Sequence, residues 1–291
     1  MCGISGIWDL DKNRSSNLTS IINKMSGCLN NRGPDDQGTW VNNKFKICFG
    51  HKRLSIIDLS KFGRQPMVKG RYVITYNGEI YNFKDIRKEL ESLKLKISFN
   101  SNSDTEVILN ACIAWGVEKT LSKISGMFAF ALWDKKVKKL YLVRDKFGMK
   151  PLYFYNKNNL FLFASQSKSF TKYPNWNEKI NSESLALFFN LGYIPSNKSI
   201  YENTTQVPPG HYFEIDSKGK IKKRCYWNIE KVIKKSKSEF IDNNLNFEKT
   251  LEELISISVK KHMISDVSLG SFLSGGIDSS LISLFMQKNS I

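Results

Sequence analysis

Short runs of apolar residues, or of apolar residues alternating with polar ones, recur through about the first 210 residues of the chain. Runs of about four to eight residues with this pattern predict β-strands. The predicted strands are Gly3–Asp9, Lys46–Gly50, Tyr72–Tyr76, Met127–Asp134, Lys139–Arg144, Leu152–Tyr155 and Leu160–Ala164.

Between these runs, apolar residues recur at helical spacing, as they do along Leu18–Leu29. The other predicted helices are Asp85–Leu93, Thr105–Trp115 with Asp104 as its N-cap, and Leu185–Leu191. Strands interleaved with helices predict layered sheets that helices cover.

Proline and glycine gather at Pro195 and at Val207-Pro208-Pro209-Gly210, which indicates the exit from a first domain. The stretch Asn228 to Asn246 is rich in Lys, Ser and Asn without a clear period, and it predicts a surface linker.

After this linker the apolar spacing becomes helical again, with Asn246 as the expected cap of a helix that reaches Met263. A buried strand, Val267–Leu273, and a helix, Leu281–Gln287, are predicted next. One strand and one helix cannot bury a doubly wound sheet, so we expect the second domain to be cut off after its first βα unit.

The length of 291 residues suggests two domains, and 41% hydrophobic residues suffice for a sizeable core. Neither an apolar run of membrane-spanning length nor a basic segment followed by an apolar one is present, so we predict no membrane span and no secretory signal. The five cysteines lack CxxC spacing, which predicts neither zinc nor disulfides and favours the reducing cytoplasm.

The formal net charge of +17 raises the question of nucleic-acid binding. The positive residues are mostly lysines spread along the chain, whereas nucleic-acid recognition favours clustered arginine with interleaved aromatic residues. We therefore expect no nucleic-acid partner, but some attraction for anionic substrates.

A cysteine directly follows the start methionine. Removal of Met1 would leave Cys2 with a thiol and a free α-amine, whose unperturbed pKa is near ~8. Such an amine can take the proton of its own thiol, directly or through a water. Cys2 is therefore a candidate nucleophile that needs no histidine.

A second chemical signal is the sequence Ser274-Gly275-Gly276-Ile277-Asp278-Ser279-Ser280, between a predicted strand and a predicted helix. Adjacent glycines let the backbone approach an anion, and a helix N-terminus offers unpaired N–H groups and the positive end of a dipole. The loop lacks the lysine of a Walker A motif. It predicts a pyrophosphate cradle.

Together these two signals, and the motifs between them, resemble the glutamine-dependent asparagine synthetase family. The matching motifs are Arg32-Gly33-Pro34-Asp35, His51 to Ile56, Tyr76 to Asn82, Ser103 to Glu106, Gly126 to Phe130, Arg144-Asp145 to Gly148, Lys150 to Tyr153 and Pro208 to His211.

The resemblance implies an α+β, four-layer αββα N-terminal-nucleophile hydrolase domain over residues 2–215 and a linker over residues 216–245. The start of an α/β ATP-pyrophosphatase domain, of the adenine nucleotide α-hydrolase-like class, would occupy residues 246–291. The family often forms homodimers.

In the first domain, the resemblance implies hydrolysis of L-glutamine to glutamate and ammonia through a Cys2 thioester, without a cofactor. The Asn77 side-chain amide and the Gly78 backbone N–H would form the oxyanion hole. Read without the resemblance, Asn-Gly is more typical of a type I′ hairpin turn.

The substrate itself would be held by charged groups. Arg53 would bind its α-carboxylate, and Glu79 and Asp104 are the candidates for its α-ammonium. Leu54 and Ile56 complete the expected glutamine site. Without the resemblance, Arg53 would be a solvated edge residue and Asp104 only a helix cap.

In the second domain, the resemblance implies ATP, Mg²⁺ and L-aspartate, with L-asparagine, AMP and diphosphate as products. The residues expected to hold ATP are Leu273, Ser274, Gly275, Gly276, Asp278, Ser279 and Ser280. Asp278 is a candidate magnesium contact, but no protein metal site is predicted. The aspartate site would lie beyond Ile291.

Two features leave alternatives open. Gln166 stands where the family commonly has Glu, which puts coupling between the domains in doubt. The acceptor pocket would lie outside this sequence, so a related amidotransferase acting on a sugar, a peptide or a lactam precursor remains an alternative. A non-catalytic glutamine-binding homologue is another.

Overall fold

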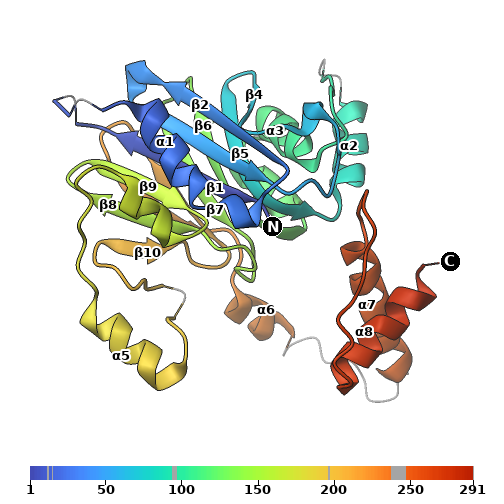
Figure 1. The fold of residues 1–291 in the computed structure, drawn as a ribbon. Helices are drawn as coiled ribbons and strands as arrows, with labels where there is room; N and C mark the ends of the chain where they lie inside the picture. Colours follow the sequence, from blue (N-terminus) through green and yellow to red (C-terminus); the bar gives the residue numbers. More distant parts are fainter. Residues whose placement is uncertain (12, 15, 94–96, 196, 237–246, 291) are drawn as a thin grey trace. The chain divides into compact units, whose positions relative to one another are not determined.

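The computed structural model describes residues 1–11, 13–14, 16–93, 97–195, 197–236 and 247–290 (Figure 1). The chain divides into two compact units, Met1–Trp227 and Asn228–Ile291. No helix among the described residues is long and apolar enough to cross a membrane.

The first sheet of the first unit has six strands in the order β10-β8-β9-β1-β3-β2. Their bounds are β1 Gly3–Asp9, β2 Asp36–Asn42, β3 Ile47–Arg53, β8 Tyr153–Lys157, β9 Leu160–Ala164 and β10 Thr204–Gln206. In the centre, Ser5 of β1 lies opposite Gly50 of β3 and Ala164 of β9. All of β1 is buried because both faces of the sheet are covered.

The second sheet also has six strands, in the order β12-β11-β7-β6-β5-β4. Their bounds are β4 Met67–Lys69, β5 Tyr72–Ile80, β6 Gly126–Asp134, β7 Lys139–Arg144, β11 His211–Ile215 and β12 Ile221–Cys225. The longest pairing joins β5 to β6 and places Gly78 opposite Phe128.

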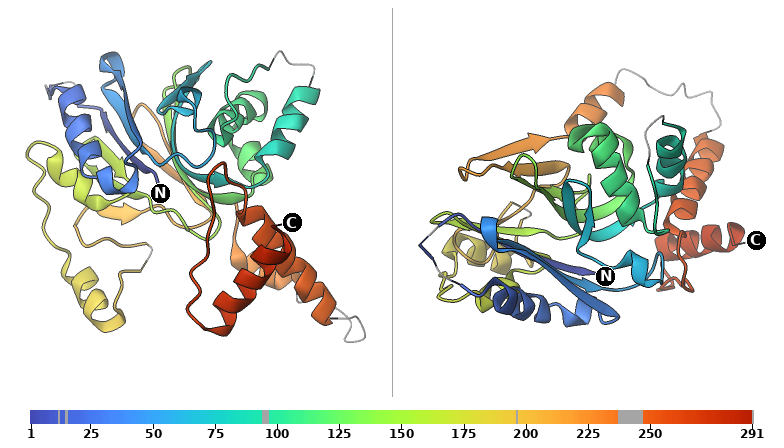
Figure 2. Two further views of the ribbon diagram at one scale, coloured as in Figure 1. Left: turned by 45° about the vertical axis from the view of Figure 1, so that its right-hand side comes forward. Right: turned by 90° about the horizontal axis from the view of Figure 1, so that it is seen from above.

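Helices cover the outer faces of the two sheets (Figures 1 and 2). Helix α1 lies on the first sheet, and α2, α3 and α4 form a layer on the second. The helices of this unit are α1 Leu18–Gly27, α2 Phe83–Ser92, α3 Asp104–Trp115, α4 Val117–Lys123 and α5 Ser182–Leu191. The short 3₁₀ helices are η1 Asn30–Arg32, η2 Asn43–Phe45, η3 Lys61–Gly63 and η4 Ser167–Lys172. The result is the predicted four-layer αββα arrangement.

Large aromatic side chains fill the space between the sheets. Trp8 of β1 and Trp133 of β6 meet edge to face, with their ring centroids 5.0 Å apart. Both are at most 1% exposed and belong to a cluster that draws residues from both sheets. A second cluster joins α1 to the first sheet through Ile21, Ile22 and Leu162.

The seven strands predicted between Gly3 and Ala164 are confirmed, three of them (β1, β7 and β9) with the same bounds. The sequence pattern missed β2, β4, β10, β11, β12 and α4, because these elements are short or carry polar residues that face solvent. Asp104 is not an N-cap: Ser103 holds that place, and its hydroxyl accepts a hydrogen bond from Thr105 N at 3.1 Å.

The proline-rich passage at Val207 lies inside the first unit, not at its exit. Val207 is fully buried, and β10 and β11 flank it within the two sheets. Strand β12 lies within the predicted 216–245 linker. The sequence does not predict this strand because it consists mostly of lysine and arginine, and it becomes a strand by pairing with β11. Residues 237–246 lie outside the described residues.

The second unit contains three helices in its described part: α6 Ile229–Ser236, α7 Phe247–His262 and α8 Ile277–Lys288. Helices α7 and α8 pack together and bury Val259 and Phe285. Residues 267–273 form no strand, and Phe272 is 99% exposed. The predicted strand is therefore wrong for this unit, whose described residues offer no other strand to pair with it.

Candidate active site

The first unit contains a cavity of about 270 Å³ beside the N-terminus. It lies between the start of β1, the loop after β3, the middle of β5 and the first turn of α3. All eight residues predicted for the glutamine site line it: Cys2, Arg53, Leu54, Ile56, Asn77, Gly78, Glu79 and Asp104. Sequence positions more than one hundred residues apart thus meet at one place.

Backbone groups of the loop after β3 hold the Cys2 thiol. Leu54 N donates to Cys2 Sγ at 3.3 Å, and the thiol donates to Leu54 O at 3.5 Å. Burial raises the pKa of the Cys2 thiol, although the Leu54 N–H and the nearby N-terminal amine oppose the shift. The thiol is therefore protonated at neutral pH and needs a base to become a nucleophile.

The N-terminal amine is suited to be that base. In the structure it belongs to Met1, and its pKa is lowered by burial and by the positive charges of Arg32 and Lys150, against an opposing effect of Cys2. Arg32 also donates from Nε to Cys2 O at 2.9 Å and so fixes the Cys2–Gly3 peptide. Removal of Met1 would place the amine on Cys2 itself.

Asn77 and Gly78 lie in the middle of β5, not in a turn, so the hairpin alternative is wrong. Asn77 is 1% exposed, and its Nδ2 has no hydrogen-bond partner among the described residues. A buried amide donor without an acceptor is uncommon and calls for an explanation. Here the amide lines the cavity that also contains Cys2.

Gly78 is required by a close approach of two strands. A Cβ atom at this position would lie 2.2 Å from Met127 O and 2.6 Å from Phe128 Cα. We expect Gly78→Ala to push β5 away from β6, to lower stability by about 1–3 kcal/mol and to impair glutamine hydrolysis. Thermal unfolding and glutamate release measure the two effects.

Gly27→Ala in α1 is the matched control, because nothing lies within 4 Å of a Cβ there. Alanine should stabilise this helix slightly and leave hydrolysis unchanged. Equal behaviour of the two variants would contradict the close-approach argument.

Arg53 is buried, with 6% of its surface exposed, so it is not a solvated edge residue. Its guanidinium donates to Ser60 O at 2.9 Å and to Asp58 O. The loop after β3 thereby holds the positive charge against the cavity.

Asp104 supplies a buried carboxylate at the start of α3. It accepts hydrogen bonds from Tyr76 Oη at 2.7 Å and Ile80 N at 2.9 Å. Burial raises the pKa of Asp104 from 3.8 to about 6, although these hydrogen bonds oppose the shift. Glu79, which also lines the cavity, adds a like charge that raises it further.

The raised pKa of Asp104 predicts a pH dependence. Below about 6 the carboxyl is neutral, so the KM for glutamine should rise as pH falls through this value. For stability the sign is opposite. The folded state keeps the proton to higher pH than the unfolded chain, so this group's contribution falls as pH rises from 3.8 to about 6. Asp104→Asn should abolish the pH dependence of KM and the matching pH dependence of stability, and it should keep the KM high at every pH. Steady-state kinetics measure the first effect, and thermal unfolding measures the second.

The sequence reasoning missed several lining residues, among them Gln65, Tyr76 and Lys150. Lys150 is 7% exposed, and burial lowers the pKa of its ammonium group. Asp145 accepts from Lys150 N at 3.0 Å, and so places it. Lys150 belongs to one of the matching motifs, but its sequence position, far from Cys2, gives no sign that it lines the same cavity.

The second unit brings the seven predicted nucleotide-binding residues into one loop and the first turn of α8. Gly275 has a φ of +84°, Gly276 is the N-cap of α8, and the Ser274 and Ser279 hydroxyls lie 3.0 Å apart. All of these groups are at least partly exposed. A positive φ at Gly275 and free N–H groups in a first helical turn fit a phosphate chain.

Comparison with known proteins agrees with this arrangement. A family model described as a glutamine amidotransferase domain matches residues 1–227, and one described as asparagine synthase matches residues 250–290. Solved glutamine phosphoribosylpyrophosphate amidotransferase from B. subtilis shares the fold, with a TM-score of 0.56, 18% identity, and coverage of 78% of this chain and 49% of that chain.

Similar curated proteins include two asparagine synthetases of Bacillus subtilis and an amidase of Gibberella zeae. Asparagine synthetase [glutamine-hydrolyzing] 3 and 2 of Bacillus subtilis are 36% and 35% identical over 97% and 99% of this chain. The chain spans 44% and 39% of their lengths. Amidase chry2 of Gibberella zeae is 30% identical over 97% of the chain, which spans 42% of that protein. Because the amidotransferase model matches the whole first unit, the chain belongs to the glutamine amidotransferase domain family.

Proposed function

We propose that the first unit hydrolyses L-glutamine to L-glutamate and ammonia through a thioester on Cys2. The observation that carries this proposal is the Asn77 amide, buried without a partner among the described residues, in the same cavity as the Cys2 thiol. A donor kept ready for an oxygen that gains charge during the reaction is what acyl transfer requires.

The steps follow from the groups around the cavity. With Met1 removed, the α-amine of Cys2 takes the Sγ proton, and the thiolate attacks the carboxamide carbon of glutamine. Asn77 Nδ2 and the Gly78 N–H stabilise the resulting oxyanion. The C–N bond then breaks, and ammonia leaves with the proton from the amine. A water molecule, deprotonated by the same amine, hydrolyses the thioester and regenerates the thiol.

Charge complementarity orients the substrate in this proposal. Arg53 binds the α-carboxylate, and Asp104 together with Glu79 binds the α-ammonium. Leu54 and Ile56 line the remaining wall. Loss of one partner of such a buried charged contact costs about 2–5 kcal/mol.

For the longer enzyme, we propose that the ammonia converts L-aspartate to L-asparagine at the expense of ATP, which becomes AMP and diphosphate. The loop from Leu273 to Ser280 would hold the nucleotide, with Mg²⁺ offsetting the charge of its phosphates near Asp278. The proposal includes a cytoplasmic setting, no nucleic-acid partner and a homodimer. The five cysteines, odd in number and without CxxC spacing, support the cytoplasmic setting.

A second candidate keeps the glutaminase step and changes the acceptor. The similarity to amidase chry2 supports this alternative, because a relative that is named an amidase and not an asparagine synthetase also matches 97% of this chain. The role of Gln166, which lies at the start of η4, in coupling the two steps stays a prediction.

Glutamate release from glutamine, without ATP or aspartate, tests the proposal on the purified chain. Intact mass must first show that Met1 has been removed. Turnover is expected. If a chain of the correct mass that unfolds cooperatively shows no turnover, the proposal that the first unit hydrolyses glutamine without ATP, aspartate or any further part of the enzyme is contradicted.

A further inference from the structure

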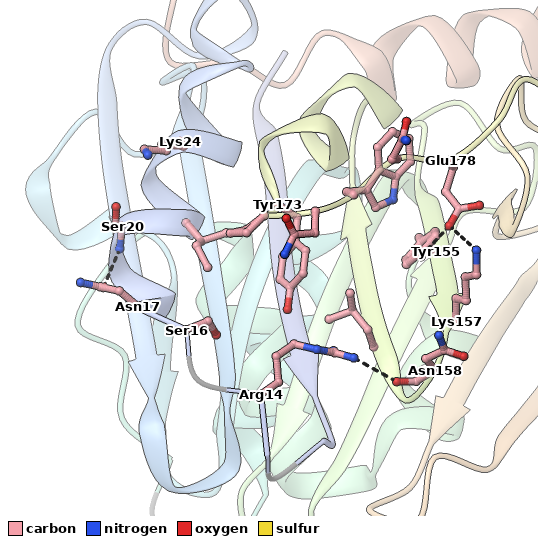
Figure 3. A pocket seen from close by; sticks show the side chains of 16 residues that line it. Arg14, Ser16, Asn17, Ser20, Lys24, Tyr155, Lys157, Asn158, Tyr173 and Glu178 are labelled. Carbon is pink, nitrogen blue, oxygen red and sulfur yellow. Dashed lines mark hydrogen bonds and ion pairs between the residues drawn. The ribbon is translucent and has the colours of Figure 1, made fainter.

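The first unit contains a second cavity, of about 570 Å³, beside α1 (Figure 3). It shares no lining residue with the Cys2 cavity. In its wall, Glu178 accepts hydrogen bonds from Tyr155 Oη and Lys157 Nζ, each at 2.9 Å. Loss of one of these bonds should therefore lower stability without affecting glutamine hydrolysis.

His51 of β3 is a buried group that the proposed reaction does not use. It is 1% exposed and does not line the Cys2 cavity. Its Nε2 lies 3.0 Å from Tyr76 O of β5. Because a carbonyl oxygen can only accept a hydrogen bond, Nε2 carries the proton. The His51 ring thus ties a strand of the first sheet to a strand of the second.

The other ring nitrogen of His51 is a buried acceptor. Nδ1 has no hydrogen-bond partner among the described residues. Burial lowers the pKa of His51 from 6.5 to about 4, and the positive charge of Arg53 acts in the same direction, although the bond to Tyr76 O opposes the shift. The ring is therefore neutral at neutral pH and is not suited to proton transfer. A buried acceptor without a donor also costs stability, so stability alone does not explain this histidine.

Tyr76 lies on an edge of β5 that no strand covers in the described part of the chain. The pairing of β5 with β4 ends at Ile74. Beyond that point, Tyr76 N donates to Gln65 Oε1 at 2.7 Å, and Tyr76 O accepts from His51 Nε2. Two side chains thus bind the backbone groups that a neighbouring strand would otherwise bind.

The same edge presents the N–H of Gly78. Opposite Gly78, Phe128 N donates to Asp145 Oδ2 at 3.1 Å, and Phe128 O accepts from Asp145 N at 2.8 Å. Gly78 and Phe128 are therefore a non-hydrogen-bonded pair, and the Gly78 N–H points away from β6. It faces the same side as the backbone groups of Tyr76 and of Ile80, two residues to either side.

The position of the oxyanion donors depends on how firmly this edge is held. The Tyr76 carbonyl belongs to the peptide group that leads directly into Asn77, whose amide lines the cavity. Without the His51 donor, this peptide group could rotate, and the Asn77 amide and the Gly78 N–H would move with it. A displacement of about 1 Å can lower a rate by about 10²-fold.

We propose that His51 is a positioning residue: its Nε2–H holds the Tyr76 carbonyl and thereby aims the Asn77 amide and the Gly78 N–H at the oxyanion. This inference rests on the proposed glutaminase step.

Steady-state glutamine hydrolysis by the full chain and by His51→Gln, His51→Asn and His51→Phe tests this role. The amide nitrogen of Gln can reach the position of Nε2, whereas that of Asn reaches only the position of Nδ1. Phe keeps the ring shape without a donor. His51→Gln should keep most of the wild-type kcat. His51→Asn and His51→Phe should lower kcat by about 10–10²-fold with little change in KM.

Two control variants separate this role from a general loss of stability. Thr75→Val removes the hydrogen bond from Thr75 Oγ1 to Gly50 O, at 3.3 Å, which also joins β5 to β3. Tyr155→Phe removes the bond to Glu178 in the wall of the second cavity. Both should lower the melting temperature and leave kcat unchanged.

Alkylation of Cys2 by iodoacetamide, followed by peptide mass mapping, is the readout that does not need turnover. It should proceed at the wild-type rate in every variant, because this reaction forms no oxyanion. Thermal unfolding shows which variants fold. His51→Asn and His51→Phe, one polar and one apolar, are two independent tests of the missing donor.

Three results would overturn the positioning role in an active enzyme: equal kcat in His51→Gln and His51→Asn, a raised KM with kcat preserved, or alkylation that slows in step with kcat. A limb lost from the pH profile of kcat in His51→Gln would do the same, since His51 would then transfer a proton. If the wild-type chain without Met1 is alkylated at Cys2 but hydrolyses no glutamine, the proposed function itself fails, and the inference fails with it.

Discussion

Replacement of Cys2 by alanine is expected to lower kcat for glutamine hydrolysis by at least about 10⁴-fold, because the variant has no atom that can form the thioester. The α-amine, the Asn77 amide and Arg53 remain in place in this variant. They can still bind glutamine, so isothermal titration should show substrate binding without turnover.

Cys225→Ala is the control for the Cys2 variant. Cys225 is exposed and lies outside the cavity, and its thiol donates a hydrogen bond to Trp227 O at 3.3 Å. Its replacement should leave kcat unchanged. Peptide mass mapping after treatment with an electrophilic glutamine analogue should place the label on Cys2. A label on another cysteine, or turnover that persists in Cys2→Ala, would refute the nucleophile.

Asn77→Ala is expected to reduce kcat by about 10²–10³-fold, or about 2.7–4 kcal/mol in the transition state, with a small change in KM. The reason is that the Asn77 amide has no partner among the described residues in the resting protein. Its hydrogen bond is made only when the oxyanion forms, so removal affects the transition state more than substrate binding.

Asn110→Ala is the matched control for Asn77→Ala. Asn110 is also buried, in α3, but its amide already donates to Ser98 O at 3.2 Å and lies outside the cavity. Its replacement should lower the melting temperature and leave kcat unchanged. If Asn77→Ala instead raised KM with kcat preserved, Asn77 would be a substrate-binding residue and the oxyanion role would fail.

The strongly periodic elements were predictable because their local pattern agrees with their surroundings. β1 carries Ile4, Ile7 and Trp8 and is buried along its whole length, and α1 has one apolar stripe that meets the first sheet. β12 was not predictable, since its lysines face solvent and only pairing with β11 makes it a strand. The opposite error occurred at 267–273, where an apolar run has no strand to pair with in the described part of its unit.

The candidate site divides in a similar way. Cys2 and the Gly275-Gly276 loop could be recognised because their chemistry lies within a few consecutive residues. Lys150 could not, because its burial beside Cys2 depends on the turn that Asp145 holds. The Asn-Gly pair at 77 and 78 was ambiguous until the register of β5 against β6 showed a strand.

The sequence by itself identified a candidate nucleophile, the family resemblance and the positions of seven strands, since these depend on residue type and short-range spacing. Only the tertiary structure decided which groups meet. Arg53 is buried, and burial raises the pKa of Asp104 to about 6. The Asn77 amide has no partner among the described residues, and a second cavity lies beside α1. The physical reason is that burial, electrostatic environment and hydrogen-bond satisfaction arise from contacts between residues that are distant in the chain.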